Sequence, residues 1–518
     1  MSAATRPSAA PIANTRARAP GWWVLAGLVL LAAALRLSTL GLQSFWYDEA
    51  FTPVHVLHAS LSATLHSVVH SENTPPLWYV IAWLFSRVFG SGMIALRLPS
   101  ALFGIATVPV AWAIGRELAG RRAAIACAAL VAVNPLFVWY SQEARAYGLF
   151  VLSAAVAMLC FVRAERDPTP RAMAAFAVSA VVALLSHYFA VFLLAPMVLW
   201  LLRERSTRRA CLPAVCVIAL AGLALVPLIS AQGGHGTQWI GRWALSDRLQ
   251  AIPQYFLTGY SGAPLGHGVE LLVALPILAG LGLGLWRMSG PSSPGVTLGG
   301  GREGAPESSR ASALRGVQIA FAIAACGVVL PIVLALAGAD YLAPRNLVAA
   351  MIPVTALIAA VVLWPGGGRA ATMLVAIIAL AFLAISIDVD LSPRLQRGNW
   401  RDVAKALRGG GGERAITTVE LGAAPLEYYL PGVHNLPRGS SVRVREIDET
   451  GYAPLRSSAG DPPAPGFRLL ARLDIDGLIV YRFRSPVAVT IAEASLRRRV
   501  ITLAHPEVLV PADAQVSG

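Results

Sequence analysis

Long apolar stretches recur along the chain, and each approaches the ~20 residues that a helix needs to cross a bilayer. Short polar segments that contain most of the arginines separate them. The expected spans are residues 22–40, 98–115, 123–140, 147–163, 172–185, 189–202, 211–230, 268–287, 316–337, 346–364 and 370–387. This pattern predicts an all-α polytopic membrane protein with about 11 transmembrane helices.

The distribution of arginine predicts which loops face which side. We place residues 1–21 in the cytoplasm as a tail before an uncleaved first span, because no convincing cleavage site follows the apolar run. If residues 76–89 crossed the bilayer, every later arginine clump would face outward, against the positive-inside rule. We therefore predict that residues 76–89 form an interfacial helix on the outer surface and that the C-terminus is external.

Two segments differ from the spans in composition. Residues 288–315 are rich in Gly, Ser and Pro, which predicts a flexible cytoplasmic linker within the membrane domain of residues 22–388. Beyond residue 388, Arg414–Val419 and residues 478–483 have the pattern of strands, and residues 400–407 that of an amphipathic helix. The chain is therefore expected to end in an extracytoplasmic α/β domain over residues 389–518.

Composition narrows the class of protein. Hydrophobic residues make up 56% of the chain and charged residues 14%, whereas about 25% charged residues are typical of soluble proteins. A soluble globular enzyme is thus excluded. The net charge of +14 lies in loop clumps rather than in patches interleaved with aromatic residues, which argues against a nucleic-acid partner. All five cysteines fall in expected spans, without metal-site spacing, so the external domain forms no disulfide.

The external loop over residues 41–97 contains two adjacent acids. Asp48 and Glu49 come shortly after the first span. They fit a solvated helix start, where acids suit the helix dipole, and they equally fit a reaction centre with catalytic carboxylates. They are also candidate metal ligands, but no spacing requires a divalent cation, and the loop alone leaves these alternatives open.

Histidines gather in the same loop. His66 and His70 are four residues apart, which places two imidazoles on one helix face and fits either a surface helix or a pair of metal ligands. His70, Glu72 and Asn73 precede a Pro-Pro pair at residues 75–76, and we count them as candidate substrate-binding residues.

Other external turns bring polar side chains to the same membrane face. Glu143 is a third candidate catalytic acid, and Arg145 follows it in a tight turn that a helix-capping ion pair would also explain. Arg345 is the only basic residue of its loop and suits a phosphate group. Arg36 either snorkels to the interface or binds a lipid phosphate. The further candidate substrate-binding residues are His187, Tyr188 and Tyr341.

Carboxylates, histidines and arginine from separate turns are therefore expected to converge outside the membrane. Such a set suits a reaction between a phospholipid donor and an external acceptor. A carboxylate would act as general base toward a hydroxyl, and arginine would stabilise a departing phosphate.

Four motifs in this order resemble a known family. They are Ser-Phe-Trp-Tyr-Asp-Glu-Ala at 44–50, Thr-Pro-Pro-Leu-Trp-Tyr at 74–79, Arg-Leu-Pro-Ser at 97–100 and Tyr-Ser-Gln-Glu-Ala-Arg-Ala-Tyr at 140–147. They resemble the GT-C membrane glycosyltransferases, in the bacterial branch related to dolichyl-phosphate-mannose protein mannosyltransferases and to the aminoarabinose transferase of lipid A. The resemblance covers residues 22–205 well and the later spans only through Tyr341–Arg345.

The resemblance implies an inverting transfer of a sugar from a polyprenyl-phosphate carrier, on the outer side of a bacterial cell membrane. It implies that Asp48 is the catalytic base or orients the acceptor, that Glu143 is a second acid and that Arg345 contacts the carrier phosphate. The family often has His or Lys before the Pro pair, where this chain has Asn73 and Thr74, so His70 or Glu72 is expected to substitute.

Two other classes compete with the transferase. A flippase for a lipid-linked sugar would need charged residues inside the spans, which are nearly absent apart from Arg36. A non-catalytic assembly protein would not need both Asp48 and Glu143. The sequence leaves open the sugar, with mannose as the default, and the acceptor, which is a protein, a lipid or a glycan.

Overall fold

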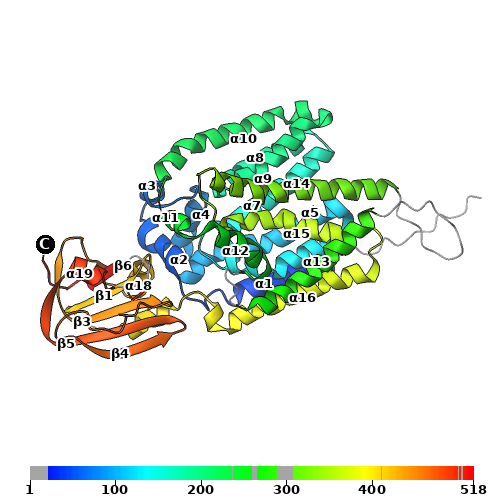
Figure 1. The fold of residues 1–518 in the computed structure, drawn as a ribbon. Helices are drawn as coiled ribbons and strands as arrows, with labels where there is room; N and C mark the ends of the chain where they lie inside the picture. The colour runs from blue at the N-terminus through cyan, green and yellow to red at the C-terminus, as the bar shows by residue number, and fades with distance from the viewer. Residues whose placement is uncertain are drawn as a thin grey trace, which may run out of the picture.

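A computed structural model describes residues 21–235, 237–259, 265–289, 307–409, 411–499, 501–502 and 506–517. A bundle of helices forms most of the molecule, and a sheet domain lies at one end of it (Figure 1). Almost all of the expected N-terminal tail and most of the expected linker over 288–315 lie outside the described residues.

Among the described residues, ten helices account for the expected spans. They are α1 (Trp22–Leu37), α5 (Met93–Val133), α7 (Tyr147–Arg166), α8 (Pro170–Ser186), α9 (Ala190–Arg203), α10 (Arg205–Gln232), α13 (His267–Ser289), α14 (Glu307–Leu336), α15 (Met351–Val362) and α16 (Gly368–Leu391). In the described part of the chain, seven helical segments are long and apolar enough to cross a membrane. The fold is that of a polytopic, mainly helical membrane protein.

The remaining helices outside the sheet domain connect these ten. They are α2 (Tyr47–Phe51), the π-helix η1 (Thr52–Val56), α3 (Leu61–Ser71), α4 (Leu77–Phe89), α6 (Pro135–Ser141), α11 (Gln238–Arg242), α12 (Leu245–Thr258), and the 3₁₀ helices η2 (Pro344–Ala350) and η3 (Pro393–Leu395). Helix α4 has 13 residues, which gives a length of about 20 Å. Its length is similar to that of α9 and α15, so the interfacial position of α4 stays a prediction that rests on the charge distribution.

Two expected spans, 98–115 and 123–140, are joined in one assigned helix, α5. The backbone leaves helical geometry at Ala119 and Gly120, and Gly120 has a φ of +83°, a conformation that glycine adopts readily. A Cβ atom on Gly115 would lie 2.6 Å from the carbonyl oxygen of Ala123. The two halves of α5 therefore pack against each other after a sharp reversal. The second half also ends earlier than expected, because Asn134 caps the separate helix α6.

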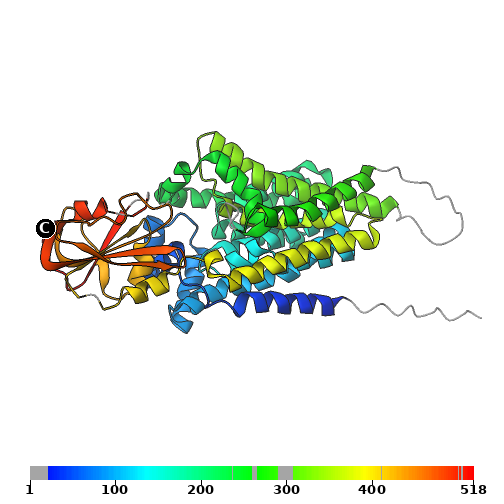
Figure 2. The same ribbon diagram turned by 60° about the horizontal axis from the view of Figure 1, so that its bottom comes forward.

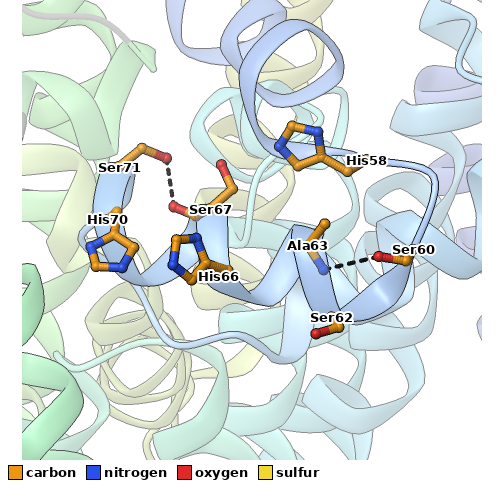
Figure 3. A pocket seen from close by; sticks show the side chains of 8 residues that line it. All are labelled: His58, Ser60, Ser62, Ala63, His66, Ser67, His70 and Ser71. Carbon is orange, nitrogen blue, oxygen red and sulfur yellow. Dashed lines mark hydrogen bonds between the residues drawn. The ribbon is translucent and has the colours of Figure 1, made fainter.

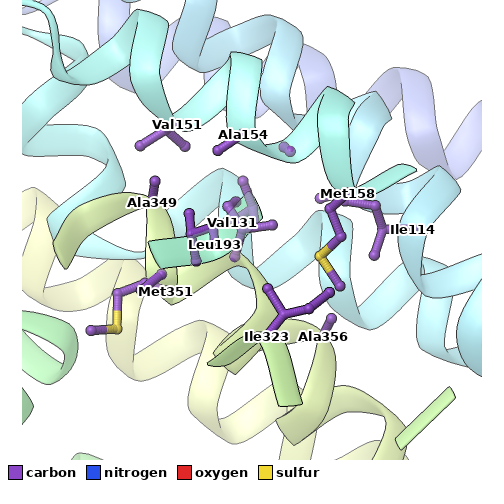
Figure 4. Packing of buried hydrophobic residues seen from close by; sticks show 14 of the residues in the cluster. Ile114, Val131, Val151, Ala154, Met158, Leu193, Ile323, Ala349, Met351 and Ala356 are labelled. Atoms are coloured by element: carbon purple, nitrogen blue, oxygen red, sulfur yellow. The ribbon is translucent and has the colours of Figure 1, made fainter. Parts of the chain in front are cut away.

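The core of the bundle is made of aliphatic side chains from α5, α7, α9, α14, η2 and α15 (Figure 4). Small residues let backbones approach closely: a Cβ on Gly148 of α7 would lie 2.9 Å from the carbonyl oxygen of Ser100 in α5. Outward-facing leucines such as Leu220, Leu223 and Leu278 are more than half exposed. Such an apolar exterior is typical of helices that face lipid.

Ion pairs distinguish the end of the bundle away from the sheet domain. Glu117 of α5 pairs with Arg163 and Arg166 of α7, and Arg315 of α14 contacts Glu165 and Glu204. The three arginines of these pairs belong to polar segments that the positive-inside rule predicts to be cytoplasmic. Helix α1, dark blue in Figure 2, begins at this end. The alternation of the helices thus agrees with the expected topology, and the assignment of sides stays a prediction.

The C-terminal domain has a mixed sheet of seven strands, in the order β2-β6-β1-β3-β5-β4 with β7 against β3. The strands are β1 (Arg414–Val419), β2 (Val433–Asn435), β3 (Ser441–Tyr452), β4 (Arg468–Ile475), β5 (Leu478–Ala492), β6 (Pro506–Pro511) and β7 (Val516–Ser517). Strand β1 pairs in parallel with β3, with Arg414 opposite Glu446. Helices α17 (Trp400–Ala406) and α18 (Ala423–Tyr429) pack on one face, and α19 (Glu493–Arg497) packs on the other.

The loop after α1, which the sequence predicts to be external, docks directly on this domain. The Ser44 hydroxyl donates to the carbonyl of Gly398 at 2.8 Å and accepts from the amide of Trp400 at 3.1 Å. The amide of Phe45 donates to the Tyr429 hydroxyl at 2.8 Å. The segment that leads to the acidic pair is therefore held between α1 and the sheet domain.

Candidate active site

Glu49 is buried and fully engaged. Its side chain is 0% exposed, and Arg97 donates to both carboxylate oxygens, at 2.7 and 2.6 Å. The amide of Ala144 donates to the same carboxylate at 2.9 Å. Arg97 also donates to the carbonyls of Leu40, Gln43 and Ser44. This pair fixes the first loop and the 142–146 turn on α5, so Glu49 has a structural position rather than the accessible one expected of a catalytic acid.

We expect Glu49→Gln to lower the free energy of unfolding by about 3–5 kcal/mol, because it leaves the Arg97 guanidinium buried without its counter-charge. The matched control is Glu117→Gln, since Glu117 also pairs with two arginines but at the exposed end of the bundle. The control should change stability by about 0–1 kcal/mol. Unfolding in detergent, followed by circular dichroism, measures both. Equal effects of the two substitutions would contradict the assignment.

Asp48, the neighbour of Glu49, has a more open environment. Its side chain is 15% exposed, and one carboxylate oxygen lies 2.5 Å from a terminal nitrogen of Arg345. The Arg345 guanidinium lies over the ring of Trp239, 4.9 Å from its centroid. Asp48 follows α1 and Arg345 precedes α15 in sequence, so the tertiary fold brings together two residues that the sequence analysis had selected separately.

Glu143 lies in the turn after α6 and is also buried. One carboxylate oxygen is 3.4 Å from Arg397, and the other has no hydrogen-bond partner among the described residues. Burial raises the pKa of Glu143 from its ordinary value of 4.5 to about 7, although the charge of Arg397 opposes this rise. The carboxyl group therefore changes its protonation state near neutral pH, as groups that move protons often do.

Glu72 and Arg145 form a bidentate pair, with both distances 3.0 Å. The Arg145 guanidinium lies 6.0 Å from the centroid of the Tyr79 ring, and its Nη1 is 3.4 Å from the carbonyl oxygen of Asp48. The pair therefore joins the end of the first loop to the 142–146 turn beside Asp48. Arg145 was expected to bind substrate, and here it contacts the residues around Asp48.

The turn between α8 and α9 is largely buried. His187 is 4% exposed, its ring stacks on Phe150 at 4.6 Å, and its Nδ1 accepts from the amide of Phe189. Burial lowers the pKa of His187 to about 3, so its imidazole is neutral at physiological pH. The Tyr188 hydroxyl donates to Gln232 at 2.6 Å, and Gln232 donates to carbonyls of the first loop.

The histidines of α3 lie in an open hollow of about 590 Å³ (Figure 3). The rings of His66 and His70 are 4.3 Å apart, and His58 also lines the hollow. Asn73 donates to the carbonyl of His235. Tyr341 is 45% exposed. Among the described residues, no hydrogen bond, ion pair or ring contact joins these candidates to Asp48, Glu143 or Arg345, so their role in substrate binding stays a prediction.

The position of Arg36 fits neither of the alternatives considered from the sequence, a side chain that snorkels to the interface or one that binds a lipid phosphate. Arg36 is 0% exposed, and it donates to Ser141 and to the carbonyls of Ala32, Val131 and Ala132. The residue neither snorkels nor faces a lipid phosphate. It instead satisfies carbonyl groups where the α5 helix ends and thereby joins α1 to α5.

Each of the three candidate catalytic acids contacts an arginine of opposite charge. Asp48 contacts Arg345, Glu49 contacts Arg97, and Glu143 contacts Arg397. Among the described residues, no group of three or more His, Cys, Asp or Glu side chains is arranged to hold a metal ion. The carboxylates of Glu49 and Asp48 already pair with Arg97 and Arg345, and a divalent cation at these two acids stays an untested alternative.

Sequence reasoning missed three side chains at this centre, namely Arg97, Trp239 and Arg397. Arg97 belongs to the Arg-Leu-Pro-Ser motif at 97–100, but only the fold shows its contact with Glu49. Arg397 follows the last expected span, on the side that the sequence predicts to be external, and it could have been noted because positive charge is disfavoured there. Nothing in the local sequence distinguishes Trp239.

Comparison with known proteins gives one match in sequence. Residues 73–230 match the family model of dolichyl-phosphate-mannose-protein mannosyltransferases. The match covers the segment from Asn73 to α10, which includes Arg97, Glu143 and Arg145. It agrees with the resemblance drawn from the motifs. No curated protein sequence matches the chain.

Two solved structures illustrate the similarity in fold. ArnT from Cupriavidus metallidurans, solved with undecaprenyl phosphate, has 14% identity and a TM-score of 0.41, with 90% of this chain and 98% of that chain covered. The oligosaccharyltransferase AglB from Archaeoglobus fulgidus has 15% identity and a TM-score of 0.41, with coverage of 79% and 59%. This chain thus matches little more than half the length of AglB. Similarity at this level carries no conclusion about activity.

Proposed function

We propose that this protein is a membrane glycosyltransferase that moves a sugar from a polyprenyl-phosphate carrier to an acceptor hydroxyl on the outer side of a bacterial cell membrane. The observation that carries the proposal is the contact between Asp48 and Arg345, at the end of the bundle where the turns converge. The family match over residues 73–230 supports it. We infer a hexose or pentose donor, with mannose as the first candidate.

Asp48 is the general base of this proposal because it is the accessible acid of the centre. Glu49 already accepts from Arg97 and Ala144, and Glu143 is 0% exposed. Asp48 takes the proton of the acceptor hydroxyl, whose oxygen then attacks the anomeric carbon. The bond from that carbon to the phosphate oxygen breaks, and the sugar is transferred with inversion.

Arg345 stabilises the leaving polyprenyl phosphate. The described residues give its guanidinium one hydrogen bond, to Asp48. An arginine has five N–H donors in a planar fork, so Arg345 retains groups that can bind a phosphate. Its ring contact with Trp239 limits the rotation of the fork. A fixed positive charge at this point would stabilise the negative charge that develops on the departing oxygen.

The test is an assay of donor breakdown. The full chain is reconstituted in liposomes with a panel of polyprenyl-phosphate sugars and a crude membrane extract as the source of acceptor. We expect mass spectrometry to detect free polyprenyl phosphate from one donor with the parent protein and not with Asp48→Asn. Equal release from parent and variant, or release of no product while the sugar-linked lipid crosses the bilayer intact, would contradict the transferase.

A further inference from the structure

Arg397 is the least expected residue of the centre. It lies in the segment between η3 and α17, where the chain leaves the bundle and enters the sheet domain. Its side chain is 1% exposed, and its guanidinium lies 4.1 Å from the centroid of the Trp139 ring. One terminal nitrogen donates to the carbonyl of Trp139 at 3.0 Å. The charged group is therefore placed inside the bundle, at the base of the 142–146 turn.

Two buried carboxylates face this guanidinium. The Arg397 Nη2 lies 3.4 Å from Glu143, and the Nε lies 3.7 Å from Glu49. Glu49 already has a bidentate partner in Arg97, whereas Glu143 has Arg397 as its only ion-pair partner among the described residues. The charge of Glu143 therefore depends on Arg397 far more than the charge of Glu49 does.

The docking of the sheet domain sets the place of Arg397. Gln43 accepts from the backbone amide of Arg397 at 3.0 Å, and Ser44 is hydrogen-bonded to Gly398 and Trp400 on either side of Asn399. Trp400 is 1% exposed in the core between α17 and the sheet. If the domain shifted, this segment and its guanidinium would move with it.

We propose that Arg397 is a positioning residue that holds the Glu143 carboxylate in place and sets its protonation, so that the sheet domain is a required part of the active site. The proposal rests on the proposed transferase function, in which Glu143 lies beside the base Asp48. The domain thus completes the site from outside the membrane, rather than serving only as a separate acceptor-binding module.

The environment of Glu143 fixes the direction of the expected change. The titratable and charged groups that face it are Arg397 from the domain junction, Asp48 and Glu49 from α2, Arg345 from η2, Tyr140 from α6 and Tyr147 from α7. Removal of the Arg397 charge takes away the larger of the two arginine effects that oppose protonation, while burial and the two carboxylates, which favour the protonated acid, are unchanged. The protonation midpoint of Glu143 must therefore rise, whichever protonation state the reaction uses.

The experiment is an infrared titration of the full chain in detergent. The carboxyl band that Glu143→Gln removes identifies Glu143, and its midpoint is followed in the parent and in Arg397→Gln. We expect a midpoint near 7 in the parent and one higher by roughly one unit or more in the variant. The pH profile of transfer should move in the same direction. An unchanged midpoint overturns the proposal even if transfer is abolished.

Two control variants distinguish an effect of the Arg397 charge from an effect of packing. Arg401→Gln removes an arginine from the same junction, one that donates to the carbonyl of Leu42 and does not face Glu143, and it should leave the midpoint unchanged. Arg397→Lys keeps the charge and should stay closer to the parent than Arg397→Gln. A shift in Arg401→Gln, or an equal shift in Arg397→Lys, would contradict the role of the Arg397 charge.

A double variant covers the case in which Arg397→Gln does not fold. The double variant Arg397→Gln/Glu143→Gln lacks both the buried carboxylate and the guanidinium that pairs with it. We therefore expect it to recover folding. A double variant as unstable as the single one overturns the proposal, because Arg397 would then act through packing alone. Because the titration and folding readouts need no donor, failure of this proposal is distinguishable from failure of the transferase function.

Discussion

Replacement of Asp48 by asparagine is expected to reduce sugar transfer by about 10²–10⁴-fold, the usual contribution of a general base. Asparagine keeps the size of the side chain but cannot take the acceptor proton. The side chains of Asp48 and Arg345 are 15% and 20% exposed, so we expect loss of their pair to cost far less stability than loss of the Glu49–Arg97 pair. Release of polyprenyl phosphate from the reconstituted protein measures the rate.

The matched control for this substitution is Asp402→Asn. Asp402 is also an acid that pairs with a basic residue, Lys405, but it lies exposed on α17 in the sheet domain. It should retain the rate of the parent. If Asp48→Asn kept most of its activity, or if both variants lost activity equally, Asp48 would not be the base.

Replacement of Arg345 by alanine is expected to raise the KM for the donor by about 10- to 100-fold. A hydrogen bond to a charged group contributes about 1.5–3 kcal/mol, and 1.4 kcal/mol corresponds to a factor of ten. A fall in kcat is expected as well, because the charge on the leaving phosphate grows in the transition state. Initial rates at increasing donor concentration separate the two effects.

Arg242→Ala is the control for the Arg345 substitution. Arg242 is also an arginine that pairs with an acid, Glu420, but both of these side chains are exposed. Its loss should not alter saturation by the donor. Arg345→Lys restores the charge without the planar fork, and we expect it to recover part of the loss. Equal donor saturation in Arg345→Ala and parent would refute the phosphate contact.

Local patterns were sufficient to predict many of the elements. The strand expected at Arg414–Val419 is β1 with the same bounds, and the two spans expected at 172–185 and 189–202 are the separate helices α8 and α9. The period of apolar residues along one strand or helix contains this information, because it reflects burial of that element alone. Gly120 lies between two expected spans, 98–115 and 123–140, so a turn there was predictable from the sequence. The sharpness of the turn depends on the close packing of Gly115 against Ala123.

The candidate site was predicted less completely, because its residues come from distant parts of the chain. The sequence selected Asp48, Glu143 and Arg345 as polar groups of external turns, since such groups are costly beside apolar spans. It could not pair Arg345 with Asp48, which precedes it by 297 residues. It also assigned Arg36 to the lipid interface, whereas Arg36 lies buried between α1 and α5.

The sequence by itself determined a multispanning helical bundle, a C-terminal α/β domain and a set of acids and arginines in the turns at one end. Only the tertiary structure decided which acid is accessible. Asp48 and Glu49 are adjacent, but neighbouring positions on a helix point about 100° apart. Glu49 therefore faces Arg97 in the interior, while Asp48 faces Arg345 and keeps 15% of its side chain exposed. Arg397 reaches Glu143 across 254 residues of sequence, because the sheet domain docks on the first loop.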